Sequence, residues 1–210
     1  MKISVITAAF NSAATISETI ASFDRQSHPS KDHWVIDGNS SDETKDLIVP
    51  SHERFLFSEK DTGVYDAMNK VIARATGDVV GFLNADDYYE SPDVLIWVSS
   101  AFEDPEADLV YGNLRYVDFD DTDKVVRDWR SEDFTLGMFD RGWMPPHPTV
   151  YARRELFEKF GGFDLGFQIC ADWEWLYRMF AIHKVRVKHI EEYIVRMRLG
   201  GISNRSIRNV

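Results

Sequence analysis

The segment from Glu59 to Asp87 constrains the fold of this chain more than any other. It contains a turn, an amphipathic helix, a glycine stop, an apolar strand over Val79 to Leu83, and then the adjacent carboxylates Asp86 and Asp87. A helix that leads directly into a buried strand is typical of a βαβ unit, which builds a parallel sheet. Open α/β folds bind ligands at the carboxyl edge of such a sheet. We therefore expect a ligand site where this strand ends.

The same alternation of strand and helix precedes this segment. Apolar, β-branched runs are typical of strands buried on both faces of a parallel sheet, and apolar residues at a spacing of three and four predict helices. The predicted elements are the strand Ile3–Phe10, the helix Ala13–Arg25 with Ser12 as N-cap, the strand Trp34–Ile36, a short helix that buries Leu47 and Ile48, the strand Arg54–Ser58 and the helix Val64–Ala75.

The alternation becomes less regular after residue 103. Ser91 and Pro92 open one more helix, with the proline in its first turn. Beyond it we predict strands over Leu109–Val117 and Val125–Trp129, helices over Arg154–Phe160 and Asp172–Phe180, and an extended stretch over Val185–Arg198. The sequence therefore predicts one α/β domain over residues 1–210, with a mostly parallel central sheet flanked by helices and a mixed C-terminal region.

The charge of the chain excludes one class of partner. The formal net charge is −11, whereas a nucleic-acid binder normally carries a basic stripe that neutralises phosphates. We predict no nucleic-acid partner. Positive charge gathers only between Lys184 and Arg208. That segment suits a phosphate or lipid surface, which leaves peripheral membrane association open, but a solvated tail would have the same composition.

Cysteine content and hydropathy indicate the compartment. The single cysteine, Cys170, excludes an intramolecular disulfide framework and fits a reducing environment. No N-terminal run resembles a signal peptide, and no apolar run reaches the roughly 18 residues of a membrane span. We predict a cytoplasmic location, extended to the inner face of the plasma membrane if the basic segment binds lipid. Oligomeric state stays open.

Carboxylates at the ends of two predicted strands are candidate ligand-binding groups. Asp37 begins a polar turn after the second strand, where it is placed to accept hydrogen bonds from a base or ribose. Asp86 and Asp87 follow an apolar strand, and a carboxylate there needs a cation, a hydrogen-bond donor or water. Hard oxygen ligands suit Mg²⁺ or Mn²⁺. The alternative is that these residues are ordinary turn and cap residues.

A third carboxylate, Asp172, lies among tryptophans at the start of a predicted helix. Desolvation there would raise its basicity, as a general base that deprotonates a sugar hydroxyl requires. The neighbouring Trp173 offers a face for sugar stacking. Alternatively, Asp172 only caps the helix. His147 lies between two prolines and is a weaker candidate for contact with an acceptor or a phosphate.

Five blocks, taken in order, resemble the signature blocks of glycosyltransferase family 2, and the resemblance covers nearly the whole chain. The blocks are Thr7–Asn11 (TAAFN), Asp37–Asp42, Gly63–Lys70 (GVYDAMNK), Asn84–Asp87 (NADD) and Ala171–Asp172. This family implies inverting, metal-dependent transfer from nucleoside-diphosphate sugars on a Rossmann-like GT-A fold. Many bacterial members build envelope polysaccharide or exopolysaccharide. Residues 1–103 would then form the nucleotide-sugar-binding half, and residues 104–210 the half that binds a saccharide or lipid-linked acceptor.

The resemblance also implies roles for individual residues. Asp172 would be the catalytic base, and Asp86 would hold Mn²⁺ or Mg²⁺. The nucleotide pocket would be formed by Thr7, Ala9, Asn11, Asp37, Asn69, Asn84 and Ala85. Further contacts to acceptor or phosphate are expected from Asp87, His147, Trp173, Arg196 and Arg198. The segment Arg196–Ser203 resembles the basic Gly-Gly segment that many members carry, and it would close over the site as a lid.

Departures from the family pattern keep other functions open. Asn84 stands where the metal motif often begins with Asp, Ala171 replaces the Glu of a Glu-Asp pair, and Val71 replaces a frequent Gly. A non-catalytic module that binds nucleotide sugar or glycan would fit the first two changes. A sugar-phosphate nucleotidyltransferase would show a glycine-rich basic loop after the first strand, and a nicotinamide dehydrogenase would show G-x-G-x-x-G there. Neither pattern is present.

Overall fold

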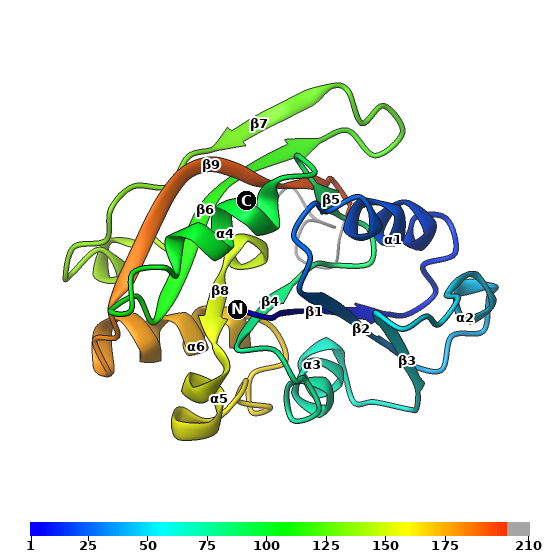
Figure 1. Cartoon of the computed structure of the whole chain (residues 1–210), viewed down its shortest axis with the longest axis horizontal. Helices are drawn as coiled ribbons and strands as arrows, with labels where there is room; N and C mark the ends of the chain where they lie inside the picture. Colours follow the sequence, from blue (N-terminus) through cyan, green and yellow to red (C-terminus); the bar gives the residue numbers. More distant parts are fainter. Residues whose placement is uncertain (201–210) are drawn as a thin grey trace.

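The computed structural model describes residues 1–200 and is built around one nine-stranded mixed sheet with helices on both faces (Figure 1). The strand order is β3-β2-β1-β4-β8-β6-β9-β5, and β7 pairs with β6 outside this path. The strands are β1 Ile3–Ala9, β2 Lys31–Asp37, β3 Arg54–Ser58, β4 Val79–Phe82, β5 Tyr88–Tyr89, β6 Leu109–Val117, β7 Val125–Trp129, β8 Tyr151–Arg153 and β9 Val187–Arg198.

Strands β1 to β4 form the parallel half of the sheet. β1 pairs in parallel with β2 and β4, and β2 pairs in parallel with β3, so the predicted alternation is confirmed here. The register aligns Ala9 with Asp37 and Ile6 with Phe82. The loops that follow β1, β2 and β4 consequently leave the sheet at one edge, which is where an α/β fold of this kind binds ligands.

The second half of the sheet is mixed. β8 runs antiparallel to both β4 and β6, β6 pairs with β7 and β5 with β9 antiparallel, and only the β6–β9 pair is parallel. The description "mostly parallel" therefore holds for the first half alone. The reason lies in the connections, because β6 returns through β7 without an intervening helix, as only antiparallel neighbours can.

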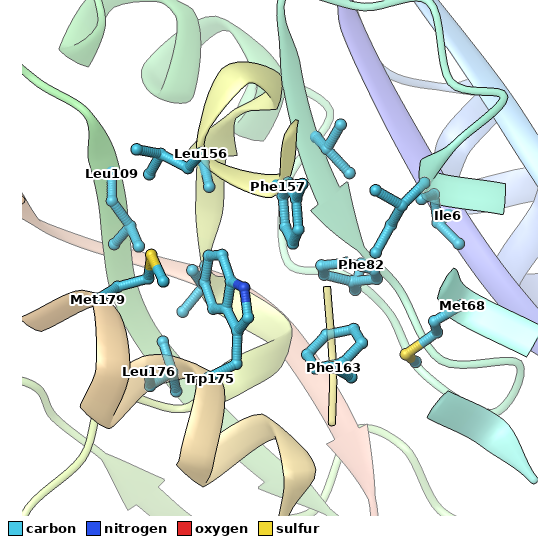
Figure 2. Packing of buried hydrophobic residues seen from close by; sticks show 14 of the residues in the cluster. Ile6, Met68, Phe82, Leu109, Leu156, Phe157, Phe163, Trp175, Leu176 and Met179 are labelled. Carbon is cyan, nitrogen blue, oxygen red and sulfur yellow. The ribbon is translucent and has the colours of Figure 1, made fainter. Parts of the chain in front are cut away.

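Helices cover the two faces of the sheet and enclose separate apolar clusters. α3, α5 and α6 pack on one face over a cluster that includes Ile6, Phe82, Phe157 and Trp175, shown in Figure 2. α1 and α4 pack on the other face. The helices are α1 Ile16–Asp24, α2 Thr44–Leu47, α3 Val64–Ile72, α4 Val94–Ala101, α5 Arg154–Phe160 and α6 Ala171–Tyr177, with short 3₁₀ turns η1 Phe139–Arg141 and η2 His147–Thr149 and a π-helical turn η3 Arg178–Ile182.

Several predicted boundaries were wrong at the helix starts. α1 begins at Ile16 because the Ser12 carbonyl accepts from the Thr15 and Ile16 N–H groups and turns the chain first. Pro92 likewise lies in a turn before α4. Ile48, directly after α2, is buried as expected, but Leu47 is 37% exposed, because a helix of a single turn buries few of its side chains.

Gly81 in β4 supports a testable prediction about packing. A Cβ built at this glycine would lie 2.2 Å from the Tyr151 ring, which is fully buried and whose hydroxyl contacts Tyr89 Oη at 2.9 Å. We expect Gly81→Ala to lower the free energy of unfolding by about 1–3 kcal/mol, since a buried ring cannot move aside without strain. Urea denaturation measures this. Gly166→Ala, in an exposed loop beside the exposed Asp164 carboxylate, should change stability by less than about 0.5 kcal/mol. Equal losses in both variants would contradict the packing argument.

Candidate active site

The turn after β4 carries the first candidate carboxylates. In the turn Asn84–Asp87 the Asp87 N–H donates to the Asn84 carbonyl at 3.1 Å, and Asn84 Nδ2 donates to Asp87 Oδ2 at 2.8 Å. Thr19 Oγ1 of α1 donates to the carbonyls of Ala85 at 3.0 Å and Asp87 at 2.7 Å, and Thr15 Oγ1 also donates to the Ala85 carbonyl. Hydrogen bonds within the turn and from the two threonine hydroxyls therefore fix its backbone.

Within this turn, Asp86 and Asp87 have different environments. Asp87 is fully buried, and burial together with the neighbouring Asp86 charge raises its pKa well above the ordinary value. Its carboxylate accepts from Asn84 and from the Arg198 N–H at 3.2 Å, so it has a structural role. Asp86 is half-buried, and burial raises its pKa too. Among residues 1–200 its carboxylate forms no ion pair, which leaves it available to a ligand.

The basic residues of β9 are already paired. Arg198 is 4% exposed, and its guanidinium donates to the Asp86 carbonyl at 2.6 Å and to the Glu18 carboxylate of α1. Arg196 forms a bidentate pair with Glu90, with Nε 2.7 Å from Oε2. These contacts hold β9 against the turn after β4 and replace the phosphate contacts that the sequence predicted. Residues 201–203 of the predicted lid lie outside the described residues.

The loops after β1 and β2 are joined to each other. Asn11 has a left-handed backbone, with a φ of 49°, and its Oδ1 accepts from the Ser41 N–H at 2.9 Å. Its own N–H donates to Ser40 Oγ at 2.9 Å. Asp37 is buried, and its carboxylate accepts from the Ser40 N–H and from Ser58 Oγ, the latter at 2.8 Å. Asp37 thus shapes the loop from beneath, while Asn11 remains exposed at the edge.

Three predicted nucleotide contacts have buried side chains. The Thr7 hydroxyl is fully buried and donates to the Leu83 carbonyl at 2.7 Å, with His33 Nε2 2.9 Å away. Burial lowers the pKa of His33 to about 3, so the ring is neutral. The side chains of Ala9 and Ala85 face an apolar cluster under α1. These three side chains therefore pack beneath the loops at the sheet edge.

Asp172 lies in the first turn of α6 and is bound by a residue from α3. Tyr65 Oη donates to Asp172 Oδ1 at 2.9 Å, across 107 positions of sequence. Close by, Asn69 forms two hydrogen bonds with the backbone of Phe163, accepting from its N–H at 2.9 Å and donating to its carbonyl at 2.8 Å. Asn69 therefore fastens the loop before α6 to α3, and this contact replaces the nucleotide contact predicted for its side chain.

His147 links Asp172 to the strand that ends in the carboxylate turn. Its buried ring stacks on Phe82 of β4 at 5.1 Å between centroids and meets Phe163 edge-on at 5.5 Å. Burial lowers the pKa of His147, and the Asp172 charge acts in the opposite direction, so the two side chains are near neighbours. Within the described chain His147 Nε2 has no hydrogen-bond partner. The base candidate and β4 are thereby connected through one side chain.

Trp173 follows Asp172 and lies at the surface. It is 36% exposed, stacks on Tyr177 at 5.2 Å between centroids, and meets Phe139 edge-on at 5.9 Å. A flat, partly exposed indole supported from behind by aromatic rings is a suitable surface for the apolar face of a sugar. Such a surface is compatible with the acceptor contact that the sequence predicts for Trp173, and that contact stays a prediction.

The residues present fit a divalent cation at Asp86. No three His, Cys, Asp or Glu side chains within residues 1–200 form a cluster able to hold a metal. Mg²⁺-type sites commonly use one or two carboxylates and take their other ligands from substrate phosphates and water. Asp86, half-buried, at the sheet edge and in no direct ion pair within the described residues, offers one such carboxylate.

Sequence reasoning missed two residues of the site. Phe10, directly after β1, is 63% exposed and lies against Gly38, where a built Cβ would be 3.5 Å from its ring and 2.5 Å from Asp61 Oδ2. The sequence signal that could have identified Phe10 is its position: a large aromatic residue at the end of a buried strand, immediately before Asn11. Tyr65 lies within the block Gly63–Lys70, but the sequence indicates no role for it, because only the fold brings α3 and α6 together.

Comparisons with known proteins identify the class. The model of the family "Glycosyl transferase family 2" matches residues 4–186, so the chain belongs to this family and is a glycosyltransferase. It is 34% identical over 183 residues to an uncharacterized glycosyltransferase of Mycobacterium tuberculosis, covering 84% of this chain and 68% of the relative. It is 31% identical over 210 residues to a PGL/p-HBAD biosynthesis glycosyltransferase of Mycobacterium bovis, covering 96% of this chain and 78% of the relative.

Solved structures show the same fold. Staphylococcus aureus TarS in complex with UDP-GlcNAc superposes with a TM-score of 0.71 at 18% identity, over 99% of this chain and 61% of that one. The mannosyltransferase PcManGT from Pyrobaculum calidifontis, in complex with GDP-Man and Mn²⁺, gives a TM-score of 0.74 at 21% identity, over 97% of this chain and 58% of that one. The chain thus has the GT-A fold and spans about 60% of the length of these structures. None of the helices in residues 1–200 is long and apolar enough to cross a membrane.

Proposed function

We propose that this glycosyltransferase moves a sugar from a nucleoside-diphosphate sugar to an acceptor hydroxyl with inversion, using Asp172 as general base and a divalent cation held at Asp86. The observation that carries this proposal is the connection through His147, whose ring stacks on the strand leading to Asp86 and feels the charge of Asp172. This connection supports the proposal that the two carboxylates, far apart in sequence, act at one edge of the sheet.

The donor site is proposed at the loops after β1, β2 and β4. The exposed Phe10 ring offers a stacking surface for the nucleotide base, next to Gly38, which has no side chain to block approach. The exposed Asn11 and the half-buried Asn84 lie at the same edge of the sheet. Proteins of similar fold bind nucleotide sugars, which supports this proposal: the solved TarS and PcManGT complexes contain UDP-GlcNAc and GDP-Man.

The reaction needs few groups. The oxygen of the acceptor hydroxyl forms a bond to the anomeric carbon, on the face opposite the departing nucleoside diphosphate. As this bond forms, Asp172 Oδ2 accepts the hydroxyl proton. The bond from that carbon to the diphosphate oxygen breaks, and its electron pair leaves with the diphosphate. A single displacement of this kind inverts the anomeric configuration, as in inverting glycoside hydrolysis. A cation at Asp86 would supply Lewis-acid neutralisation of the diphosphate charge.

The acceptor is proposed to bind over Trp173, because the base that takes its proton is the preceding residue. The stacked pair of Trp173 and Tyr177 presents a flat surface beside Asp172. We propose a saccharide or a lipid-linked saccharide, whose sugar ring would lie on the indole. A role in building cell-envelope or extracellular polysaccharide, at the cytoplasmic face of the membrane, is part of this proposal. The M. bovis relative, whose name assigns it to PGL/p-HBAD biosynthesis, supports it.

Donor binding gives the first test of this proposal. We expect one nucleoside-diphosphate sugar from a panel to raise the melting temperature with Mn²⁺ or Mg²⁺ present, because ligand at 100 times its Kd stabilises the native state by about 2.7 kcal/mol. The stabilisation should be smaller with EDTA. Incubation of the labelled donor with acceptors should then release nucleoside diphosphate and form a glycoside of inverted configuration, measured by NMR.

Other products would identify the alternatives. Pyrophosphate release would indicate a nucleotidyltransferase. Tight donor binding with neither transfer nor hydrolysis across a broad acceptor set would indicate a binding module, and a product of retained configuration would exclude the single displacement.

A further inference from the structure

Tyr65 is the only side chain within residues 1–200 that forms a direct hydrogen bond to the Asp172 carboxylate in this structure. Its hydroxyl donates to Oδ1 at 2.9 Å and thereby joins α3 to the first turn of α6. This bond restrains the torsion of the Asp172 side chain. It leaves Oδ2 as the carboxylate oxygen able to receive a proton.

The first turn of α6 has no side-chain cap of its own. α6 begins after Cys170, which has a left-handed backbone with a φ of 69° and provides no side-chain cap. The hydrogen bond from Tyr65 therefore ties the first turn of α6, which carries Asp172, to another helix.

The Tyr65 ring is itself immobilised. It packs against Phe163 at 5.4 Å between centroids, and Phe163 is held to α3 by the two backbone hydrogen bonds of Asn69. Burial, and after it the Asp172 charge, raises the pKa of Tyr65 above its ordinary value. The hydroxyl consequently keeps its proton at neutral pH, and it remains a donor to the carboxylate.

We propose that Tyr65 is a positioning residue for the transfer reaction: its hydroxyl fixes Asp172 so that Oδ2 faces the acceptor hydroxyl. This inference rests on the proposed role of Asp172 as base. A displacement of a reacting group by about 1 Å can cost on the order of 100-fold in rate, so a residue that sets the direction of the base affects catalysis without touching substrate.

The test compares three single-hydroxyl or single-carboxyl variants. Tyr65→Phe removes the hydroxyl and keeps the ring, Tyr193→Phe removes a hydroxyl of β9 that accepts from Arg130 Nε at 3.0 Å, and Asp172→Asn removes the base. For each we would measure the single-turnover transfer rate, the donor Kd, the melting temperature and the pH dependence of transfer.

We expect Tyr65→Phe to lower the transfer rate roughly 10- to 100-fold, with the donor Kd unchanged and Tyr193→Phe equal to wild type. The acidic limb of its pH profile should move to higher pH, because a hydroxyl that donates to a carboxylate favours the ionised form. The titratable groups that face Asp172 are Tyr65 from α3 and His147 from η2, with Cys170 at the start of α6. His147 is unchanged in all three variants, so it cannot produce a shift confined to Tyr65→Phe.

Two results would overturn the proposal, and they differ from each other. A Tyr65→Phe variant with a lower melting temperature but a wild-type rate and pH profile would show that Tyr65 only ties α6 to α3. Wild-type transfer by Asp172→Asn would instead remove the base assignment, and the positioning role with it.

Discussion

Asp172→Asn should abolish transfer while leaving donor binding intact. Removal of a general base typically costs about 10²- to 10⁴-fold in rate, and the amide is isosteric with the carboxylate. It can still accept from Tyr65 through its oxygen, so α6 should keep its position. We expect the single-turnover transfer rate to fall by that factor, with the donor Kd and melting temperature at wild-type values.

The control for this variant is Asp164→Asn. Asp164 lies in the exposed loop before α6, and its Oδ1 accepts only from the Gly166 N–H at 2.8 Å. Loss of a carboxylate there changes the local charge by the same amount without touching the proposed base. A full transfer rate in Asp172→Asn, or an equal loss in both variants, would assign the base to another residue.

Asp86→Asn should remove the dependence of transfer on metal. The carboxylate is half-buried, burial raises its pKa despite the nearby Arg198 charge, and among the described residues it forms no direct ion pair, so a divalent ion would offset its desolvation. We expect stimulation by Mn²⁺ to disappear and donor affinity in Mn²⁺ to fall by roughly 10- to 100-fold, close to the affinity in EDTA. Titration calorimetry with the donor, with and without Mn²⁺, measures both effects.

Two matched variants separate metal binding from damage to the fold. Asp93→Asn changes an exposed carboxylate just before α4 and should behave as wild type. Asp87→Asn should instead lower the melting temperature, because Asp87 is buried and binds Asn84 and the Arg198 N–H. Mn²⁺ stimulation that persists in Asp86→Asn would place the cation elsewhere.

The sequence predicted the parallel half of the fold well, for a local physical reason. Apolar runs with β-branched residues, such as the one that became β1, and a helix with one apolar stripe, such as α3, are recognisable without tertiary contacts. The position of Asp86 directly after such a strand placed it at the carboxyl edge. The family blocks added the fold, which the comparisons confirm.

What could not be predicted depends on contacts across long sequence distances. Arg196 and Arg198 were expected to meet phosphate, but the acids that pair with them, Glu90 and Glu18, come from distant segments with no pattern to link them. The roles of Tyr65 and Asn69 are of the same kind. Burial of individual side chains could not be predicted either. The Thr7 hydroxyl is fully buried and binds the Leu83 carbonyl. Ala171, where the family often has Glu, is fully buried at the start of α6.

The contacts from α3 to the loop before α6 affect how this enzyme can be redesigned. A division near residue 103 would separate the strands expected to hold the donor from those expected to hold the acceptor. α3, however, belongs to the first part, and through Tyr65 and Asn69 it holds Asp172 and Phe163 of the second. Chimaeras that exchange acceptor preference between relatives should therefore transplant α3 together with the α6 region, because a crossover that separates them would leave the base without its support.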